Sequence, residues 1–408
     1  MEIKDEEDRG RVAEEIQGAS LEVGRDDHCS TENPKKLPTL PSENGNSVLV
    51  FFNLLTENHE SRFVTCTKED RISNLPEHLI GSILKQLPVQ DAARMSILSR
   101  QWRYIWTTMT ALVLNYQFSK RFAKEGASGR NEFIRIVNDI IIRRNGPITN
   151  FSLHIPEEID SLQEVDQWIL FFSRNSGREH TFTKSNQPYE LPNDVFSCSK
   201  LTTLQLKNCI FMPPLQFEGF PNLYDLSLKN IDFRANSCGT VVSLPRLRKL
   251  SLFECKNLFN FNIKARILEE LVVSTCFDAI LLRLMESPCL SMVSIYFWKP
   301  VEDYVQLEGV NLSRMLSILP KLRCLVIDGH FLKFLCADQV PKWLPGAINS
   351  LRSLLLPNFQ LSDLDQLHGI LCLLRNSPNL LSLRMNHVVS KEYYLFLLIH
   401  TYGTRVGH

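Results

Sequence analysis

A recurring arrangement of leucines dominates the hydrophobic pattern of the chain after residue 200. The pattern Leu-x-x-Leu-x-Leu-x-x-Asn/Cys appears in LTTLQLKNC and LRKLSLFEC, which begin at residues 201 and 247, and in LEELVVSTC, which begins at residue 268 and has valine at the third leucine position. Weaker copies begin at residues 223, 290, 322, 351 and 380. Copies of this kind, each of about 20–29 residues with one short strand, stack their strands side by side in a parallel sheet. The pattern therefore predicts an α/β repeat architecture.

The spacing within each copy indicates which side chains form the core. The second and third leucines are two residues apart, so they point to one face of a strand and into the core, while the residues between them face outward. Cys209, Cys255 and Cys276 occupy the last position, where a small side chain fits the turn that leaves the strand. We interpret residues 111–388 as a leucine-rich-repeat solenoid with a curved parallel sheet.

Further strands and helices are expected around these repeats. Earlier strands are predicted in MTALVLN, ITNFSLHI and, less clearly, REHTFT, where His180 stands in place of a leucine. A helix is expected in NEFIRIVNDIIIRR, with an inward face of Phe133, Val137, Ile140 and Ile141.

Two more helices are indicated by their first residues. Ser161 and Glu164 have the spacing of a capping box, and Ser362 is the expected cap of SDLDQLHGILCLLR. The inward face of that last helix is predicted to consist of Leu364, Leu367, Leu371 and Leu374.

Residues 70–110 have a different pattern of hydrophobic residues, which predicts three short helices. The first follows Pro76, ends at Pro88, and carries an apolar face of Leu79, Ile80, Ile83, Leu84 and Leu87. The second begins near Asp91 and carries Ala92, Ala93, Met95 and Leu98; the third begins at Ser99 and carries Trp102, Ile105 and Trp106. So small a module buries too little surface to be comfortably stable alone, so its excess of apolar residues indicates a partner.

Composition and charge exclude several classes of function. The 408 residues contain 45 Lys plus Arg and 45 Asp plus Glu, so no overall basic field favours nucleic acid. The longest apolar runs fall short of the roughly 18 residues that span a membrane, and the acidic start is not a secretory signal. Residues 1–69 are polar and proline-rich, which predicts a disordered extension.

The cysteines and the absence of catalytic motifs favour a non-enzymatic protein of the cytoplasm or nucleus. Eleven cysteines occur without a Cys-x-x-Cys pair, which indicates neither a zinc site nor a disulfide framework. The chain has no glycine-rich phosphate loop, Gly-x-Ser-x-Gly elbow or His-Glu-x-x-His motif. We therefore expect no catalytic residue, no metal and no cofactor.

The segment ISNLPEHLIGSILKQLPVQDAARMSILSRQWRYIW, which begins at Ile72, resembles the F-box. The matching features are Ile72, Leu75-Pro76, Leu79, Ile83-Leu84, Leu87-Pro88, Ala92, Leu98-Ser99 and Trp102-Arg103-x-x-Trp106. With the repeats that follow, about residues 70–385 resemble the plant F-box/LRR family whose members often end in an FBD domain. The resemblance implies an F-box that docks a Skp-type adaptor, a cullin bound through that adaptor, and a solenoid that holds a protein substrate for ubiquitination.

The chain departs from the family at a few positions. Gln90 and Gln101 replace residues that are often basic, and Met95 replaces one that is often small and polar. Residues 389–408 form an atypical tail where an FBD domain is expected, which suggests a truncated variant.

The expected sites are two interaction surfaces. The adaptor surface implied by the resemblance comprises Leu75, Pro76, Leu79, Ile80, Ile83, Leu84, Leu87, Pro88, Ala92, Leu98, Trp102 and Trp106. For the two tryptophans, helical spacing favours a place in the module's core and at its seam with the first repeat. The outward strand positions predict a substrate surface that includes Thr203, Gln205, Asp225, Ser227, Lys249, Ser251 and Glu270. Alternatives are a receptor for a hormone or other small molecule and an interaction scaffold that acts without ubiquitination.

Overall fold

The structure is a computed structural model of the chain. The residues that it describes all belong to the compact unit Phe51–His408: 75–84, 87, 89–95, 105–122, 126–159, 162–234, 241–258, 262–274, 287–297, 312–336 and 348–386. The expected extension at residues 1–69 and the expected tail at residues 389–408 lie outside these ranges, as do Cys276 and Ser161.

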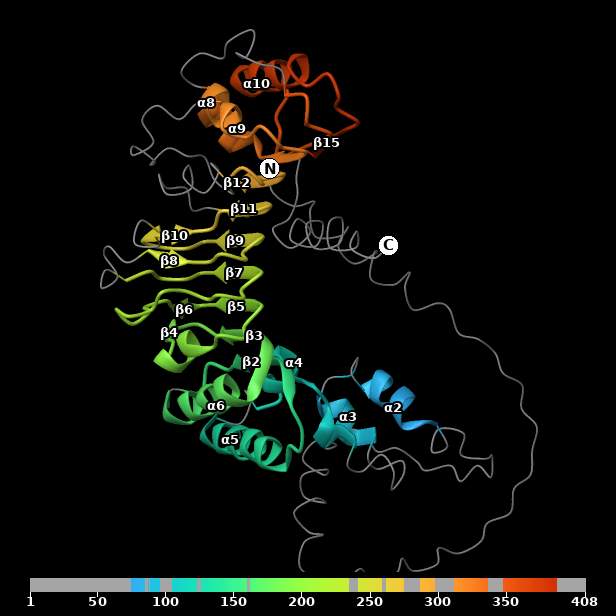
Figure 1. The fold of residues 1–408 in the computed structure, drawn as a ribbon, viewed down its shortest axis with the longest axis vertical. Coiled ribbons are helices and arrows are strands. Elements are labelled where there is room, and N and C mark those ends of the chain that lie inside the picture. Colours follow the sequence, from blue (N-terminus) through green and yellow to red (C-terminus); the bar gives the residue numbers. More distant parts are fainter. Residues whose placement is uncertain are drawn as a thin grey trace, which may run out of the picture. The chain divides into compact units, whose positions relative to one another are not determined.

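A long parallel sheet runs through the described residues (Figure 1). Its eleven strands follow one another in chain order, so each strand pairs with the strands of the preceding and following repeats. The strands are β1 (Ala111–Leu114), β2 (Ile148–Ile155), β3 (Ser176–Lys184), β5 (Thr203–Lys207), β7 (Asp225–Lys229), β9 (Lys249–Phe253), β11 (Glu270–Ser274), β12 (Met292–Tyr296), β13 (Cys324–Ile327), β14 (Ser353–Pro357) and β15 (Ser382–Asn386). All eight predicted repeats and the three earlier predicted strands are confirmed.

The register aligns the predicted core leucines across the sheet. Leu204 pairs with Leu226, and Leu226 with Leu250, so that equivalent positions stack along the solenoid in one buried row. His180 occupies this row beside Leu204 and is buried, with its ring edge-on to Phe151 and Phe182. Burial lowers the pKa of His180 to about 4, so the neutral imidazole packs where most other strands place a leucine.

Asparagines make the turns that leave several strands. Asn186, Asn208, Asn230 and Asn358 all have positive φ, a conformation that asparagine adopts more readily than most residues. The Asn208 side chain donates to the backbone oxygens of Lys184 and Asn186 and accepts a hydrogen bond from Asn230. This ladder satisfies buried polar groups between neighbouring repeats. Cys209 follows Asn208, and Cys255 follows Glu254, which also has positive φ; both cysteines are buried, as predicted.

Two small parallel sheets lie on the connections that follow the strands. One pairs β4 (Tyr189–Glu190) with β6 (Cys209–Ile210), and the other pairs β8 (Val242–Ser243) with β10 (Ile263–Lys264). Gly219 forms an additional bridge to Ser243 with φ near 129°, and a Cβ atom there would lie 1.9 Å from the Ser243 carbonyl oxygen. Only glycine fits this close approach of two backbones.

Helices form the connections near both ends of the described sheet. They are α4 (Tyr116–Ser119), α5 (Gly126–Arg143), α6 (Leu162–Asn175), η2 (Asn193–Ser197), α8 (Leu312–Ser317), α9 (Gly329–Cys336) and α10 (Leu364–Arg375). In α5 the predicted inward face is confirmed, because Phe133, Val137 and Ile140 are buried and Ile141 packs against the same core.

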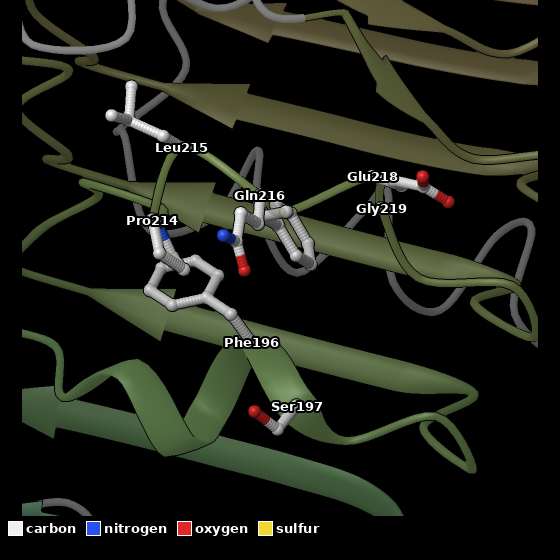
Figure 2. Close-up of a pocket in the computed structure, with 8 residues that line it drawn as sticks. Phe196, Ser197, Pro214, Leu215, Gln216, Glu218 and Gly219 are labelled. Carbon is white, nitrogen blue, oxygen red and sulfur yellow. The ribbon is translucent and has the colours of Figure 1, made fainter.

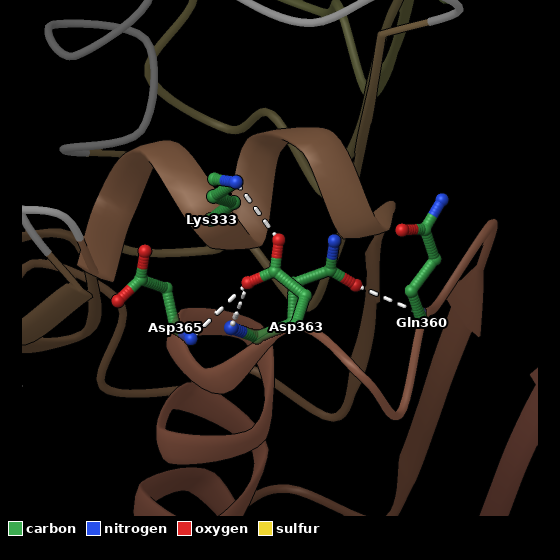
Figure 3. A network of polar contacts seen from close by, with 5 residues as sticks. Lys333, Gln360, Asp363 and Asp365 are labelled. Atoms are coloured by element: carbon green, nitrogen blue, oxygen red, sulfur yellow. Dashed lines mark hydrogen bonds and ion pairs between the residues drawn. The ribbon is translucent and has the colours of Figure 1, made fainter.

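The predicted cap and inward face of α10 are wrong in part. Asp363, not Ser362, caps the helix by accepting hydrogen bonds from the backbone amides of Asp365 and Gln366 (Figure 3). Leu364 and Leu371 are exposed rather than inward, whereas Leu367 and Leu374 pack partly against the core.

Helix α10 turns a different face toward the core than its leucine spacing indicates, because it lies very close to α9. A Cβ atom on Gly369 would lie 2.6 Å from the Cys336 sulfur and 2.8 Å from Leu332, so Gly369 marks the contact face of α10. Ile370 and Leu373 are buried on that side. Spacing of leucines alone did not reveal that a glycine forms the centre of the interface.

Candidate functional site

The F-box segment begins with two short helices and a 3₁₀ turn. They are α2 (Glu77–Leu84), α3 (Val89–Met95) and η1 (Ile105–Thr108). The Pro76 carbonyl accepts hydrogen bonds from the amides of Leu79 and Ile80, so Pro76 precedes α2 and its carbonyl starts the helix. The first two predicted helices are confirmed. The predicted cap of the third, Ser99, lies outside the described residues, and Ile105 and Trp106 belong to η1.

Helix α2 presents an apolar face to solvent. Leu79 and Ile83, four residues apart and therefore on one side of the helix, are 43% and 42% exposed. Pro76 is exposed as well, and Leu75 and Leu87 are half-buried against the core. A leucine and an isoleucine side by side on the surface of a short helix favour contact with another protein.

Three residues of the expected adaptor surface lie inside the chain instead. Ile80, Ala92 and Trp106 are buried in the main hydrophobic core, which continues from the F-box helices into the repeats. Helix α3 packs against both η1 and β1, so Ala92 is used at this seam. These three side chains therefore support the module and are not available on its surface. The side chains of Leu84, Pro88, Leu98 and Trp102 lie outside the described residues, and their role stays a prediction.

The seam between the F-box and the first repeats is also held by polar contacts. The Arg144 guanidinium donates to the Trp106 carbonyl oxygen at 3.1 Å, and the Asn145 amide donates to the Thr107 carbonyl oxygen at 2.9 Å. Burial lowers the pKa of Arg144 to about 10, which still leaves the group charged at neutral pH. The expected place of Trp106 in the core and at the seam is confirmed.

The predicted substrate residues come together on the outer face of the sheet, which is the face opposite the main core. Thr203, Asp225, Lys249 and Glu270 form one row across β5, β7, β9 and β11. Gln205, Ser227 and Ser251 form the next row on β5, β7 and β9. All seven side chains are partly or fully exposed. Their geometry suits a binding surface, and their role in substrate binding stays a prediction.

Charges interact along the first of these rows. Lys249 forms an ion pair of 3.1 Å with Glu270 and lies opposite Asp225 on the neighbouring strand. Burial raises the pKa of Asp225, Lys249 opposes this, and Glu270 and Glu179 add to it. Burial would lower the pKa of Lys249, but the hydrogen bond and charge of Glu270 and the charge of Asp225 raise it. The charged states of Asp225 and Lys249 therefore depend on each other.

The outer face becomes largely apolar from Val272 on β11 to Leu355 on β14, which the sequence analysis did not predict. Val272, Met292, Tyr296, Cys324, Val326 and Leu355 form a second buried cluster, with Phe253 packed against it. The sequences LVVS, MVSIY, CLVI and SLLLP indicate such burial on both faces, because nearly every strand position in them is apolar. Strands with continuous apolar sequence are typical of sheets that are covered on both faces.

A pocket of about 590 Å³ lies between η2 and the segment that leads to Gly219 (Figure 2). Its lining is formed by Phe196, Ser197, Pro214, Leu215, Gln216, Phe217, Glu218 and Gly219. Glu218 is the one ionisable side chain among these residues, so the lining lacks the paired acids, bases or nucleophiles that catalysis requires.

A serine–histidine contact elsewhere has a structural explanation. Ser119 Oγ lies 2.6 Å from His154 Nδ1, and Ser185 Oγ lies 3.2 Å from Nε2, so both ring nitrogens are engaged. Burial lowers the pKa of His154 to about 4, helped by the charges of Lys207 and Lys184.

The described residues include no group of three potential metal ligands and no helix long and apolar enough to cross a bilayer.

Comparisons with known proteins agree with this organisation. Residues 72–112 match the F-box domain model, and residues 165–306 match the model of the LRR repeats of FBD-associated F-box protein At5g56370. These bounds overlap the predicted F-box at residues 70–110 and the predicted solenoid.

Several Arabidopsis thaliana proteins are similar over much of the chain. F-box/FBD/LRR-repeat protein At1g13570 is 32% identical, over 78% of this chain and 76% of its own length. F-box/LRR-repeat protein At3g59200 is 26% identical over 79% of this chain and 70% of its own length, and F-box/FBD/LRR-repeat protein At5g56420 is 23% identical over 67% and 58%. An F-box followed by stacked leucine-rich repeats, with this extent of similarity, shows that the chain belongs to the plant F-box/FBD/LRR-repeat family.

Proposed function

We propose that this protein is the substrate-recognition subunit of an SCF-type E3 ubiquitin ligase. In this proposal the F-box binds a Skp-type adaptor, which links the chain to a cullin, and the solenoid binds a target protein. The observation that carries the proposal is the exposed pair Leu79 and Ile83 on α2, within the segment that matches the F-box. F-box domains generally bind Skp1-type adaptors.

Helix α2 leaves apolar side-chain area exposed to water. Full burial of one leucine or isoleucine side chain contributes roughly 1.5–3 kcal/mol, and a little under half of each side chain remains exposed here. Leu75 and Leu87 are half-buried beside the main core and extend the apolar surface. A partner that covers this face gains hydrophobic free energy that the chain itself does not use.

The outer face of the sheet at β5–β9 is the proposed substrate surface. Its side chains are polar, partly exposed and held in register by the strands, which gives a rigid platform for contacts with a folded or extended target. Such a subunit contributes to ubiquitination by raising the effective concentration of the target near the ubiquitin-loaded enzyme. It needs no catalytic residue of its own.

The test is a binding measurement with the double variant Leu79→Asp and Ile83→Asp. We expect adaptor binding to weaken at least 100-fold, because two charges would have to be buried in the interface. A matched control replaces Ile142 and Leu361, two exposed apolar residues outside the F-box, by aspartate and should bind normally. Unchanged binding of the F-box variant, with its circular dichroism and melting temperature intact, would contradict the proposal.

Affinity purification from plant tissue separates the alternatives. Recovery of both adaptor and cullin supports a ubiquitin ligase subunit, whereas adaptor without cullin indicates a scaffold that acts outside ubiquitination. A requirement for a small molecule in substrate capture would indicate a hormone receptor. We also propose a cytoplasmic or nuclear location, consistent with the cysteine spacing, which imaging of a fluorescent fusion tests directly.

A further inference from the structure

Residues at or just before the starts of the strands form a continuous row along one edge of the sheet, which we call the rim row. In this row the backbone amide of each residue donates to the carbonyl oxygen of the residue before it, over distances of 2.7–2.9 Å. The row consists of Arg178, Thr202, Tyr224, Arg248, Glu269, Ser291, Arg323, Arg352 and Leu381. Every one of these side chains is partly or fully exposed, so a partner can reach the rim row.

The middle of the rim row neutralises its own charges. Arg248 forms an ion pair of 2.5 Å with Glu269 and lies over the ring of Tyr224, with 5.9 Å between the guanidinium carbon and the ring centroid. One position further along the strands, Lys249 forms its ion pair with Glu270. The basic side chains at the start of β9 therefore have acidic partners at the start of β11.

Two arginines stand side by side further along the rim row. The Arg352 amide donates to the Arg323 carbonyl oxygen at 2.8 Å, so the two residues lie opposite each other at the starts of β14 and β13. Their other neighbours in the row, Ser291 and Leu381, carry no charge. Neither arginine forms an ion pair with a residue of the described ranges, and the Arg352 guanidinium donates to the Asn379 carbonyl oxygen at 2.9 Å. Like charges placed directly opposite on neighbouring strands repel each other.

Arg384 adds a third exposed positive charge to this part of the sheet. It lies on β15 opposite Leu355 and three residues after Leu381, which places it about 10 Å along the strand from the rim row. Ser353 and Ser382 pair with each other between these positions, and both are partly exposed. The long side chains of Arg323, Arg352 and Arg384 therefore surround two hydroxyl groups on β14 and β15.

The acidic residues described in this part of the chain are engaged elsewhere. Asp328 is buried and accepts hydrogen bonds from two backbone amides. Asp363 caps α10 and forms an ion pair of 2.9 Å with Lys333, and Asp365 lies in the first turn of the same helix (Figure 3). The three arginines are therefore available to an acidic group from outside the chain.

We propose that Arg323, Arg352 and Arg384, which we call the arginine site, bind an acidic segment of the target protein. This inference rests on the proposed substrate-recognition function and names the chemistry of the target. Each guanidinium offers N–H donors in a planar fork that matches the two oxygens of a carboxylate or a phosphate. An anion held between Arg323 and Arg352 also relieves the repulsion between them. In an extended peptide, acidic side chains two residues apart share one side at a spacing of about 7 Å, which suits contacts with separate arginines.

A nucleic acid is the rival partner, because its phosphate backbone also presents anions. Proteins that bind it use a broad basic field and many phosphate contacts. This chain has 45 basic and 45 acidic residues, and Glu269 lies in the same rim row as the arginines. A local group of three arginines beside acidic positions favours a short acidic peptide.

The test measures binding of a fluorescently labelled hexaglutamate peptide to the full chain by fluorescence anisotropy. The triple variant Arg323→Gln, Arg352→Gln and Arg384→Gln should bind at least tenfold more weakly, because three charge-assisted contacts are removed. A matched control removes the same charge from three exposed arginines outside the site and should bind within about twofold of the wild type: Arg174→Gln, Arg234→Gln and Arg266→Gln. Circular dichroism and the melting temperature verify that both variants fold. Unchanged binding by the arginine-site variant overturns the proposal, and so does an equal loss in the two variants.

A second peptide and an RNA identify the source of the anion. In the second peptide two glutamates of the first are replaced by phosphoserine. Loss of affinity in the arginine-site variant supports the proposal for either peptide, and the peptide that binds the wild type more tightly identifies carboxylate or phosphate as the source. Tighter binding of a six-nucleotide single-stranded RNA than of both peptides, lost in the arginine-site variant, overturns the proposal in favour of nucleic acid.

Adaptor binding separates failure of this inference from failure of the proposed function. The arginine-site variant should keep its affinity for the adaptor, and the variant Leu79→Asp with Ile83→Asp should keep its affinity for the peptide, because the two sites share no residue. A wild type that binds the adaptor and not the acidic peptides overturns the acidic-target inference alone. A wild type that binds the peptides through the arginine site and not the adaptor supports the site and overturns the proposed function.

Discussion

The outer face of the sheet has two contrasting regions built on the same backbone. At β5–β9 its rows consist of threonine, glutamine, serine and charged residues that water reaches. At β11–β14 the same rows carry Val272, Met292, Cys324, Val326 and Leu355, which are buried, and Tyr296 is buried in the next row. The strands pair in one continuous register across the boundary, so the change arises from side chains and not from topology.

The comparison shows that a leucine-rich repeat specifies only one of its faces. Leucines form most of the inner face of the sheet, whereas the outer positions can form either a polar surface or a second buried cluster. Helix α2 provides a third surface for comparison, because its apolar residues Leu79 and Ile83 are exposed. Substitutions at matched positions in these three regions test whether each has the character that its exposure indicates.

The largest effect is expected for Val326→Asp. Val326 is fully buried on the outer face, so the carboxylate would have to be buried without a partner. We expect the free energy of unfolding to fall by about 2–4 kcal/mol in urea titrations. Val326→Ala, which adds no charge, should cost less. A loss below about 0.5 kcal/mol for Val326→Asp would mean that this position on the outer face is open to water.

An intermediate effect should follow from Asp328 at the end of β13. Its two carboxylate oxygens accept hydrogen bonds from the amides of Phe297 and Phe331, at 2.9 and 2.8 Å. Burial raises the pKa of Asp328 to about 7 in spite of these hydrogen bonds. The unfolded chain releases this proton near pH 4 and the folded chain near pH 7, so stability should decline as pH rises through that window.

The measurement compares unfolding of the wild type and Asp328→Asn at pH 4.5, 6 and 7.5. The asparagine does not titrate, so the wild type should lose about 1–3 kcal/mol relative to the variant between the lowest and highest pH. Parallel curves for the two proteins would show that Asp328 is ionised throughout and that this end of the sheet is better hydrated than its burial indicates.

A smaller effect on stability is expected for Leu79→Asp with Ile83→Asp on α2. Both side chains already contact water, so the free energy of unfolding should change by less than about 1 kcal/mol. Ile80→Asp, one residue from Leu79 but fully buried, is the matched control and should cost about 3 kcal/mol or more. Equal losses for the two proteins would show that the exposed pair is part of the chain's own packing.

The sequence predicted the repeat positions well because the leucine pattern is periodic and each copy reinforces the others. It also predicted that Trp106 would be used in the core and that the seven polar residues would share one face. These features depend on local spacing and on the alternation of side chains along a strand. Both are properties of the sequence within a few residues.

The parts that were missed depend on contacts between distant segments. The rotation of α10 follows from the approach of Gly369 to Cys336 and Leu332 on α9, which no spacing within α10 indicates. The burial of Ile80 and Ala92 follows from packing at the seam with the first repeat, so apolar spacing could not tell a core face from a binding face. The second buried cluster was visible as a loss of alternation in the strand sequences, but alternation within one strand does not show which of its faces is buried.

The smallest effect is expected for Ser227→Asp, the counterpart of Val326→Asp in the same row. Ser227 is partly exposed on β7, and Gln205 and Ser251 flank it on β5 and β9, so a carboxylate there keeps its hydration. We expect the free energy of unfolding to change by less than about 0.5 kcal/mol, while capture of a target protein from plant extract should fall. A loss of stability comparable to that of Val326→Asp would show that β7 is covered as well. The polar rows would then be an internal surface, and the substrate site would have to lie elsewhere on the solenoid.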